Sequence, residues 1–343
     1  MSVRRSWARP LVPVYSAVLK IKDGLRHAGL LRTRKLQWPV VSVGSLSAGG
    51  AGKTPVVIAL AKLLRDEGWV VDVLSRGYGR RGRSVEQVQA AMDGAAERFG
   101  DEPVLIAQQT GVPVWVGADR FAAGERAETA ASRMSRGIHL LDDGFQHRQL
   151  GRTIDIVLIT EKDLSDALLP AGNLRESLAG LQRADVIVVR EDEFGASGKS
   201  VWQMLREGAQ VWTVRRSLRF PAPLFVFGAG LRPLAFCAIA RSEGFTATLQ
   251  EAGCGVVETV AFEDHHRYAM SDIERVVEVA KSVNGSGFVT TEKDAVKLTE
   301  AMRKRLEEHG PLMVVVLDSV FADAQVVMRA LESKLSAAEV KVL

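Results

Sequence analysis

The sequence predicts an α/β fold in which helices cover both faces of a mostly parallel sheet. Short β-branched runs alternate with Ala-rich helical stretches between residues 38 and 190. A Gly-rich loop joins the first of these runs to the first helix. A second alternating series begins after a basic, Pro-containing stretch near residue 220. Together these observations predict two α/β domains, of which the second is smaller.

The expected strands of the larger domain are short and apolar, because a parallel strand covered on both faces meets no water. The runs that fit are 40–43, 70–74, 112–116, 138–141, 154–159 and 186–189, and the first helix is expected over 55–64. In the smaller domain we expect strands over 224–228, 287–291 and 313–317 and helices near 232–242, 271–283 and 294–308. The expected parts of the chain are therefore an N-terminal helix (1–36), a larger core (37–220) and a smaller domain (221–343).

Composition excludes several classes of protein. Of the 343 residues, 47% are hydrophobic and 25% are charged, which is typical of a folded chain and excludes a disordered one. Two cysteines cannot build a disulfide scaffold or a four-cysteine zinc site, and favour a reducing compartment over secretion. No apolar run approaches the roughly 20 residues that span a bilayer, which excludes an integral membrane protein.

The N-terminal segment is strongly basic. Residues 1–40 contain nine Lys or Arg and one acid, whereas the whole chain has a net charge of only +4. A helix would gather six apolar residues on one side: Leu11, Val14, Tyr15, Val18, Ile21 and Leu25. Two interpretations stay open, which are packing of this side on the larger domain and docking on a membrane surface. Nucleic acid binding is not favoured, because aromatics are only 6% of the chain and do not alternate with the basic residues.

The sharpest motif lies between the first strand and the first helix. In that position a Gly-rich P-loop holds phosphates with its backbone N–H groups, while a Lys reaches the β- and γ-oxygens and a Thr hydroxyl binds Mg²⁺. One residue departs from the strict pattern, because Ser47 stands where the first Gly is usual. The residues expected to bind ATP in this way are Ser47, Ala48, Gly49, Gly50, Ala51, Gly52, Lys53 and Thr54.

Two adjacent acids, Asp142 and Asp143, follow the apolar run 138–141. Alone, an Asp-Asp-Gly turn after a strand is ordinary turn chemistry. Beside a P-loop it is typical of a Walker B element, whose carboxylate holds Mg²⁺ at the carboxyl end of a neighbouring strand.

Several further segments, taken together with these motifs, resemble one family, the tetraacyldisaccharide 4′-kinases of lipid A synthesis. The resemblance spans about residues 40–298. Its residues are Val43 to Ser45, Gly49 to Pro55, Ser75 to Arg80, Gly100 to Pro103, Leu141 to His147, Pro170 to Glu176, Phe262 to Tyr268 and Thr290 to Asp294. Two departures are Ser45, where the family usually has Asn, and the stretch 228–233, which fits only loosely.

The resemblance implies a P-loop NTPase-like fold and transfer of the γ-phosphate of ATP, with Mg²⁺, to the 4′-hydroxyl of a tetraacylated glucosamine disaccharide 1-phosphate. It also implies a peripheral enzyme at the cytoplasmic face of the bacterial inner membrane. The expected partners are the lipid A precursor and an anionic membrane surface, with no obligate protein partner. Such a substrate favours membrane docking by the basic N-terminal helix.

By the same resemblance, Asp101 and His265 are the catalytic pair that takes the proton of the acceptor hydroxyl, with Lys53 neutralising phosphate charge. They lie in different domains, so we expect the pair to form when the domains close on ATP. Metal ligands are expected among Thr54, Asp142, Asp143 and Glu176. Because Arg binds phosphate bidentately, phosphate and substrate contacts are expected from Arg76, Arg120 and Arg175, and from Tyr78 beside them. Thr291 to Asp294 could contact the nucleoside or simply cap a helix.

Two other classes of protein share the P-loop signal. A P-loop GTPase or ATPase switch, or a metallochaperone, would hydrolyse nucleotide without transferring it. A guanine-reading Asn-Lys-x-Asp segment would favour the GTPase, but Thr291 to Asp294 has the wrong order. A degenerate structural subunit is disfavoured because Lys53, Thr54, Asp101 and Asp142 are all present.

Overall fold

The computed structural model describes residues 5–131, 137–220, 232–239 and 242–340. Its strands are β1 (Val40–Ser45), β2 (Val70–Ser75), β3 (Glu86–Gln87), β4 (Val114–Val116), β5 (Gly137–Asp142), β6 (Ile154–Leu158), β7 (Val186–Arg190), β8 (Gln210–Arg219), β9 (Pro233–Cys237), β10 (Glu258–Ala261), β11 (Gly287–Thr291) and β12 (Leu312–Phe321). Its α-helices are α1 (Val12–His27), α2 (Lys53–Asp66), α3 (Ala95–Phe99), α4 (Asp101–Thr110), α5 (Arg120–Ala130), α6 (Glu191–Trp202), α7 (Ser242–Glu251), α8 (Met270–Ser282), α9 (Glu292–Ala295), α10 (Glu300–Glu307) and α11 (Ala324–Val340).

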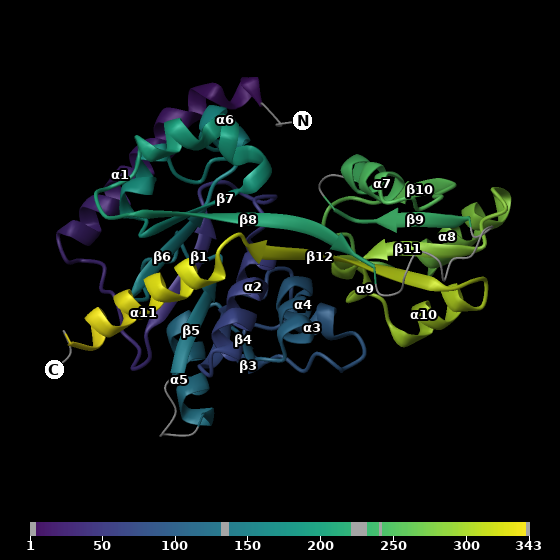
Figure 1. Cartoon of the computed structure of the whole chain (residues 1–343), viewed down its shortest axis with the longest axis horizontal. Helices are drawn as coiled ribbons and strands as arrows, with labels where there is room; N and C mark the ends of the chain where they lie inside the picture. Colours follow the sequence, from purple (N-terminus) through teal and green to yellow (C-terminus); the bar gives the residue numbers. More distant parts are fainter. Residues whose placement is uncertain (1–4, 132–136, 221–231, 240–241, 341–343) are drawn as a thin grey trace.

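Within these residues, twelve strands form one sheet in the order β10-β9-β11-β12-β8-β7-β6-β1-β5-β2-β4-β3. Only the β12–β8 and β3–β4 pairs are antiparallel. Figure 1 shows two lobes joined by β8 and β12, whose length carries them through both. The mostly parallel α/β sheet predicted from the sequence is confirmed.

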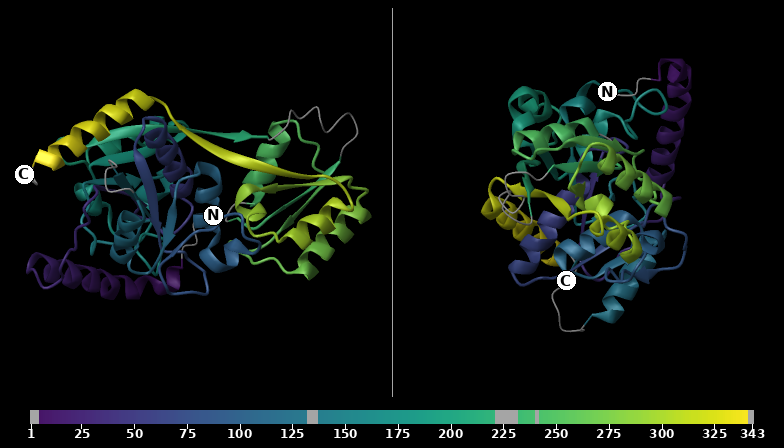
Figure 2. Two further views of the ribbon diagram at one scale, coloured as in Figure 1. Left: turned by 90° about the horizontal axis from the view of Figure 1, so that it is seen from below. Right: turned by 90° about the vertical axis from the view of Figure 1, so that its right-hand side faces the viewer.

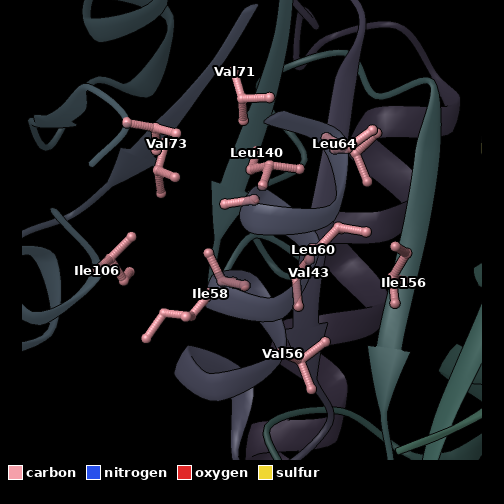
Figure 3. Close-up of a cluster of buried hydrophobic side chains, with 14 of the residues drawn as sticks. Val43, Val56, Ile58, Leu60, Leu64, Val71, Val73, Ile106, Leu140 and Ile156 are labelled. Atoms are coloured by element: carbon pink, nitrogen blue, oxygen red, sulfur yellow. The ribbon is translucent and has the colours of Figure 1, made fainter. Parts of the chain in front are cut away.

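Helices cover both faces of the sheet in the larger lobe. Successive residues of a strand point to opposite faces, so both faces carry apolar side chains that need cover. Val41 and Val43 of β1 pack into the core formed with α2, α4 and α11, whereas Val40 packs on the opposite face with α5. In Figure 3, Leu60 and Leu64 of α2 lie among strand residues such as Leu140 and Ile156. This packing fixes the start of α2, and therefore the P-loop, above the carboxyl end of β1.

The smaller lobe has its own core, built on β9 and β11 with α8 and α10. The chain then returns to the larger lobe, because Val327, Leu331 and Leu335 of α11 belong to the larger core. The division at residue 220 remains a proposal, and this packing favours a smaller unit that ends in β12.

Two predictions for the second half need correction. The helix expected near 232–242 is wrong, because 233–237 form β9, which is buried along its whole length. A short apolar run of this kind fits a buried strand and a buried helix equally well. The stretch after 216, which was interpreted as a break, begins within β8. The strand expected over 224–228 lies outside the described residues.

The N-terminal helix α1 lies along the outside of the larger lobe (Figure 2). Its apolar side faces outward, with Val14, Val18 and Ile21, and Leu11 directly before the helix, between 51% and 63% exposed. Tyr15 instead faces the lobe, where its hydroxyl donates to the backbone oxygen of Arg175 at 2.9 Å. The apolar side is therefore not covered by the domain itself. None of the helices in the described ranges combines the length and apolarity needed to cross a bilayer.

A buried polar cluster ties the linker after α1 to the sheet. His139 of β5 is fully buried and contacts Asp72 of β2 through Nδ1 (2.7 Å) and Glu128 of α5 through Nε2 (3.2 Å). Glu128 also accepts the backbone N–H of Trp38, whose ring stacks on His139. Burial lowers the pKa of His139, but its two carboxylate partners outweigh burial and raise the pKa to about 9. His139 is therefore a charged group that depends on both acids.

We predict that His139→Gln lowers the free energy of unfolding by about 3 kcal/mol at pH 6, because the buried Asp72 and the partly buried Glu128 lose their cation. The folded-state pKa lies above the unfolded value of 6.5, so this contribution is fully present below pH 6.5 and is lost as the pH rises through about 9. Urea unfolding at pH 6 and pH 9.5 measures it, with His309→Gln as the control. An equal difference at both pH values would contradict the assignment.

Candidate active site

A cavity of about 550 Å³ opens at the carboxyl edge of the sheet, beside the ends of β1, β2 and β5. In an open α/β sheet this edge, at the point where strand order reverses, is the usual ligand site. β1 is that point here, because β5 and β6 flank it. Residues predicted for the site that line the cavity are Gly49, Lys53, Arg76, Tyr78, Arg120, Asp142, Asp143, Arg175 and His265.

The P-loop has the backbone shape of a phosphate cradle. Gly49, Gly50 and Gly52 have φ between 72° and 82°, a region that favours glycine. Ser47 has no positive φ, and it forms a β-bridge to Leu174 instead, so a Cβ is tolerated where the strict motif has Gly. Ala48 N–H also donates to the Asn173 oxygen at 2.8 Å. The segment 170–176 therefore supports the P-loop from behind.

Lys53, the first residue of α2, extends back over the loop. Its Nζ donates to Ser45 Oγ at 3.4 Å and lies 3.5 Å from Asp143 Oδ1. A γ-phosphate bound at the start of α2 would meet both this ammonium group and the positive end of the helix dipole. Thr54 follows in the first turn of α2 and does not line the cavity.

The two adjacent acids have different surroundings. Asp143 (φ 49°) accepts both terminal nitrogens of Arg175, at 2.8 and 2.7 Å. Burial raises its pKa, but Arg175 and Lys53 outweigh burial and hold the pKa below its usual range. Burial, with the nearby charges of Glu102 and Asp143, raises the pKa of Asp142 to about 7. Among the described residues, Asp143 pairs with Lys53 and Arg175, whereas Asp142 forms no ion pair.

The residues present fit Mg²⁺. Oδ2 of Asp142 accepts from Ser75 Oγ at 2.9 Å, while its Oδ1 is buried with no hydrogen-bond partner among the described residues. Glu102, which the sequence reasoning missed as a candidate of its own, also lines the cavity. Mg²⁺ is usually held by one or two carboxylates together with substrate phosphates. Across the described ranges, no three His, Cys, Asp or Glu side chains are clustered to hold a metal by themselves.

Asp101 and His265 meet across the two lobes. His265 Nδ1 donates to Asp101 Oδ2 at 3.0 Å, and only His265 of the pair lines the cavity. Burial raises the pKa of Asp101, but the His265 hydrogen bond and the charge of Lys293 outweigh it and lower the pKa. The hydrogen bond to Asp101 in turn raises the pKa of His265. His265 has φ 63°, and such backbone strain in a residue other than Gly is common at functional sites.

Lys293 completes this cluster, and sequence reasoning gave it no role of its own. Its Nζ lies 3.3 Å from His265 Nε2, and within 3.7 Å of carboxylate oxygens of Glu102 and Asp264. Its neighbour Thr291 caps α9 by accepting from Asp294 N–H. The capping interpretation of Thr291 to Asp294 is thus supported, and Lys293 contacts two residues that line the cavity, His265 and Glu102.

Two arginines, Arg76 and Arg120, line the same cavity as these acids. Arg120 is buried, and burial together with the neighbouring Arg76 lowers its pKa to about 10. Burial and the charge of Arg120 also lower the pKa of His147 to about 4. Tyr78, which is 71% exposed, meets His265 edge-on at 5.9 Å. Crowded guanidinium groups of this kind favour a phosphate ligand.

Two further residues depart from the sequence predictions. Glu176, a predicted metal ligand, does not line the cavity, and its Oε2 accepts from Arg183 Nη2 at 2.6 Å. It is thus paired away from the metal site. Arg216 of β8, which the sequence reasoning missed, donates to the backbone oxygen of Ala51 in the P-loop at 2.9 Å. No sequence motif contains Arg216, because its contact with the P-loop depends on where β8 lies in the folded sheet.

Comparisons with known proteins agree with this geometry. A family model described as tetraacyldisaccharide-1-P 4′-kinase matches residues 4–336. The tetraacyldisaccharide 4′-kinase of Koribacter versatilis is 39% identical over 92% of this chain and 94% of its own length. That of Aquifex aeolicus is 35% identical over 86% and 90%. A crystal structure of LpxK from Aquifex aeolicus in complex with ATP superposes with a TM-score of 0.75 at 29% identity, covering 96% of this chain and 99% of that one. The chain therefore belongs to the tetraacyldisaccharide 4′-kinase family.

Proposed function

We propose that His265, oriented by Asp101, is the base in the reaction of this family, which is ATP-dependent phosphorylation of the 4′-hydroxyl of a tetraacylated disaccharide 1-phosphate. The observation that carries the proposal is the hydrogen bond between these two residues at the rim of the P-loop cavity. A sugar hydroxyl is a weak nucleophile, so a positioned base contributes to its attack on phosphorus.

The proposed step balances in atoms and charge. The 4′-oxygen forms a bond to the γ-phosphorus as the bond to the bridging oxygen of ADP breaks, and the hydroxyl proton passes to His265 Nε2. Asp101 holds the Nδ1–H tautomer and stabilises the imidazolium that forms. Lys293, which contacts Nε2 in the structure, would give way to the acceptor hydroxyl at this atom.

The remaining charges are divided between donor and acceptor. Lys53 and Arg175 stabilise charge on the transferred phosphoryl group, and both are kept in place by Asp143. Asp142, with Thr54 and Glu102, would hold Mg²⁺, which neutralises charge on the phosphates when bound. Arg76 and Arg120 also line the cavity, where they can bind further phosphate oxygens.

We further propose that the enzyme docks on the cytoplasmic face of the inner membrane through α1. The exposed apolar side of α1 supports docking, because no part of the described chain covers it. The basic residues of the same segment favour an anionic surface. Because the phosphate donor is ATP, docking on the cytoplasmic side of the membrane is favoured.

Transfer of labelled γ-phosphate to the tetraacylated acceptor in detergent micelles tests the reaction and the base together. We expect His265→Gln and Asp101→Asn to lower kcat by about 10²- to 10⁴-fold, with the KM for ATP changed by less than about threefold. His266→Gln is the matched control, since His266 bonds Asp272 at 3.0 Å and does not line the cavity. Release of free phosphate alone by the wild type would instead support a hydrolytic switch.

The pH dependence of kcat/KM tests the role of Asp101 separately. His265 must be neutral to accept a proton, so activity should rise with pH through its pKa. Since the hydrogen bond to Asp101 raises that pKa, the rising limb should move to lower pH in the residual activity of Asp101→Asn. A limb at the wild-type position would show that Asp101 does not act through His265.

Membrane docking is tested by substituting the exposed side of α1. Each exposed apolar side chain that enters the interface contributes roughly 1 kcal/mol or more, so Val14→Ser with Ile21→Ser should weaken binding to anionic vesicles at least about tenfold. Val320→Ser provides the control, because Val320 is 60% exposed on β12. Equal vesicle binding by all three proteins would rule out this surface of α1.

A further inference from the structure

Lys293 occupies the nitrogen of His265 that would accept the proton in phosphoryl transfer. His265 Nδ1 donates to Asp101, which leaves the lone pair of the neutral ring on Nε2. Lys293 Nζ lies 3.3 Å from that nitrogen. An ammonium group has three donors and no acceptor, so this contact is a hydrogen bond from Lys293 to the lone pair. The base is therefore already hydrogen-bonded at the atom that the reaction needs.

The backbone of Lys293 is held from both sides. The carboxylate of Asp294, which is fully buried, accepts the backbone N–H of Ala238 at 3.0 Å. The carboxylate of Glu292 accepts the backbone N–H of Leu317 at 3.1 Å. These two bonds join the start of α9 to the residue after β9 and to β12. What can move is the four-carbon side chain of Lys293, which is flexible and 22% exposed.

Two carboxylates provide this ammonium group with partners away from His265. Lys293 Nζ lies 3.7 Å from Glu102 Oε1 and 3.6 Å from Asp264 Oδ1. A small rotation of the side chain would shorten either pair while it breaks the bond to Nε2. The charge then stays paired, so the exchange does not leave an uncompensated ion in a partly buried place. Lys293 does not itself line the catalytic cavity, so its contact is with the base and not with the phosphate site.

We propose that Lys293 is a positioning residue that keeps His265 from activating water until the acceptor hydroxyl displaces it. The inference rests on the proposed function. In the reaction that Lys293 suppresses, a water oxygen bonds to the γ-phosphorus as the bond to the bridging oxygen of ADP breaks, and a water proton passes to His265 Nε2. That reaction consumes ATP without a phosphorylated product.

The competition for Nε2 separates water from the acceptor. A charged donor forms a stronger hydrogen bond than a neutral one, so the ammonium group of Lys293 holds Nε2 against water. The acceptor hydroxyl is attached to a molecule that the site also holds elsewhere. Its binding therefore supplies the free energy that displaces Lys293, and holds the hydroxyl in line with the phosphorus.

The test measures ATP hydrolysis without acceptor, and transfer to the tetraacylated acceptor, in Lys293→Met. This substitution keeps the length of the side chain and removes its charge. We expect hydrolysis to rise about 10-fold, because water gains access to the base, while kcat for transfer changes by less than about threefold. Lys304→Met is the matched control, because Lys304 is an exposed lysine of α10 in the same lobe. Lys293→Arg keeps a cationic donor and should hydrolyse ATP at close to the wild-type rate.

Two further measurements link the effect to His265. The double variant Lys293→Met with His265→Gln should hydrolyse ATP no faster than the wild type, because the exposed base is gone. The NMR chemical shift of His265 Nε2, assigned with His265→Gln, does not depend on turnover. It should change in Lys293→Met without acceptor and stay unchanged in Lys304→Met.

Other outcomes would overturn the inference. A fall in hydrolysis and transfer together in Lys293→Met would show that Lys293 stabilises the transferred phosphate instead. Faster hydrolysis that persists in the double variant would show that Lys293 does not act through His265. If His265→Gln transfers phosphate at the wild-type rate, the proposed base itself is wrong. If His265→Gln is slow but Lys293→Met hydrolyses ATP like the wild type, only the role of Lys293 is wrong, which separates the two claims.

Discussion

Two long antiparallel strands, β8 and β12, carry the chain between the lobes and set where His265 meets Asp101. Their pairing joins the smaller lobe to the sheet of the larger one, because β12 pairs with β11 as well as with β8. Contacts to the ribbon come from both lobes. Arg216 of β8 reaches the P-loop at Ala51, and Leu317 N–H of β12 donates to Glu292 Oε1 at 3.1 Å. Since α9, which Glu292 begins, also presents Lys293 to His265, the ribbon couples the P-loop to the base.

Charge separation inside the cavity explains why its residues must come from so many elements. Lys53, Arg175, Arg76 and Arg120 line the cavity together with the acids Asp142 and Glu102. Asp143 prevents the two groups from cancelling, because it pairs with Lys53 and Arg175, while Asp142 forms no ion pair within the described part of the chain. A single helix or loop could not present both signs of charge around one ligand. The carboxyl edge of a parallel sheet can, because neighbouring strands all end there.

Much of the larger lobe was predictable, since buried parallel strands and a Gly-rich turn leave strong local patterns. The site was predictable where motif residues lie at strand ends, as for Lys53 and Asp142. The site was less predictable where the position of a residue depends on packing between distant segments of the chain. Arg216 has no local signature, the motif that contains Lys293 does not show that Lys293 contacts His265, and the apolar run of β9 fits a helix as well as a strand. Glu176 shows the reverse case, in which a motif residue supports the fold by pairing with Arg183.

The most direct test of the account is a double-mutant cycle on kcat for Asp101→Asn and His265→Gln in the phosphoryl transfer assay. If the two residues act as one unit, the double variant should be about as slow as the slower single variant, because the second substitution removes nothing that still functions. If the two effects multiply, each residue contributes independently, and the claim that the lobes meet to form one base is contradicted.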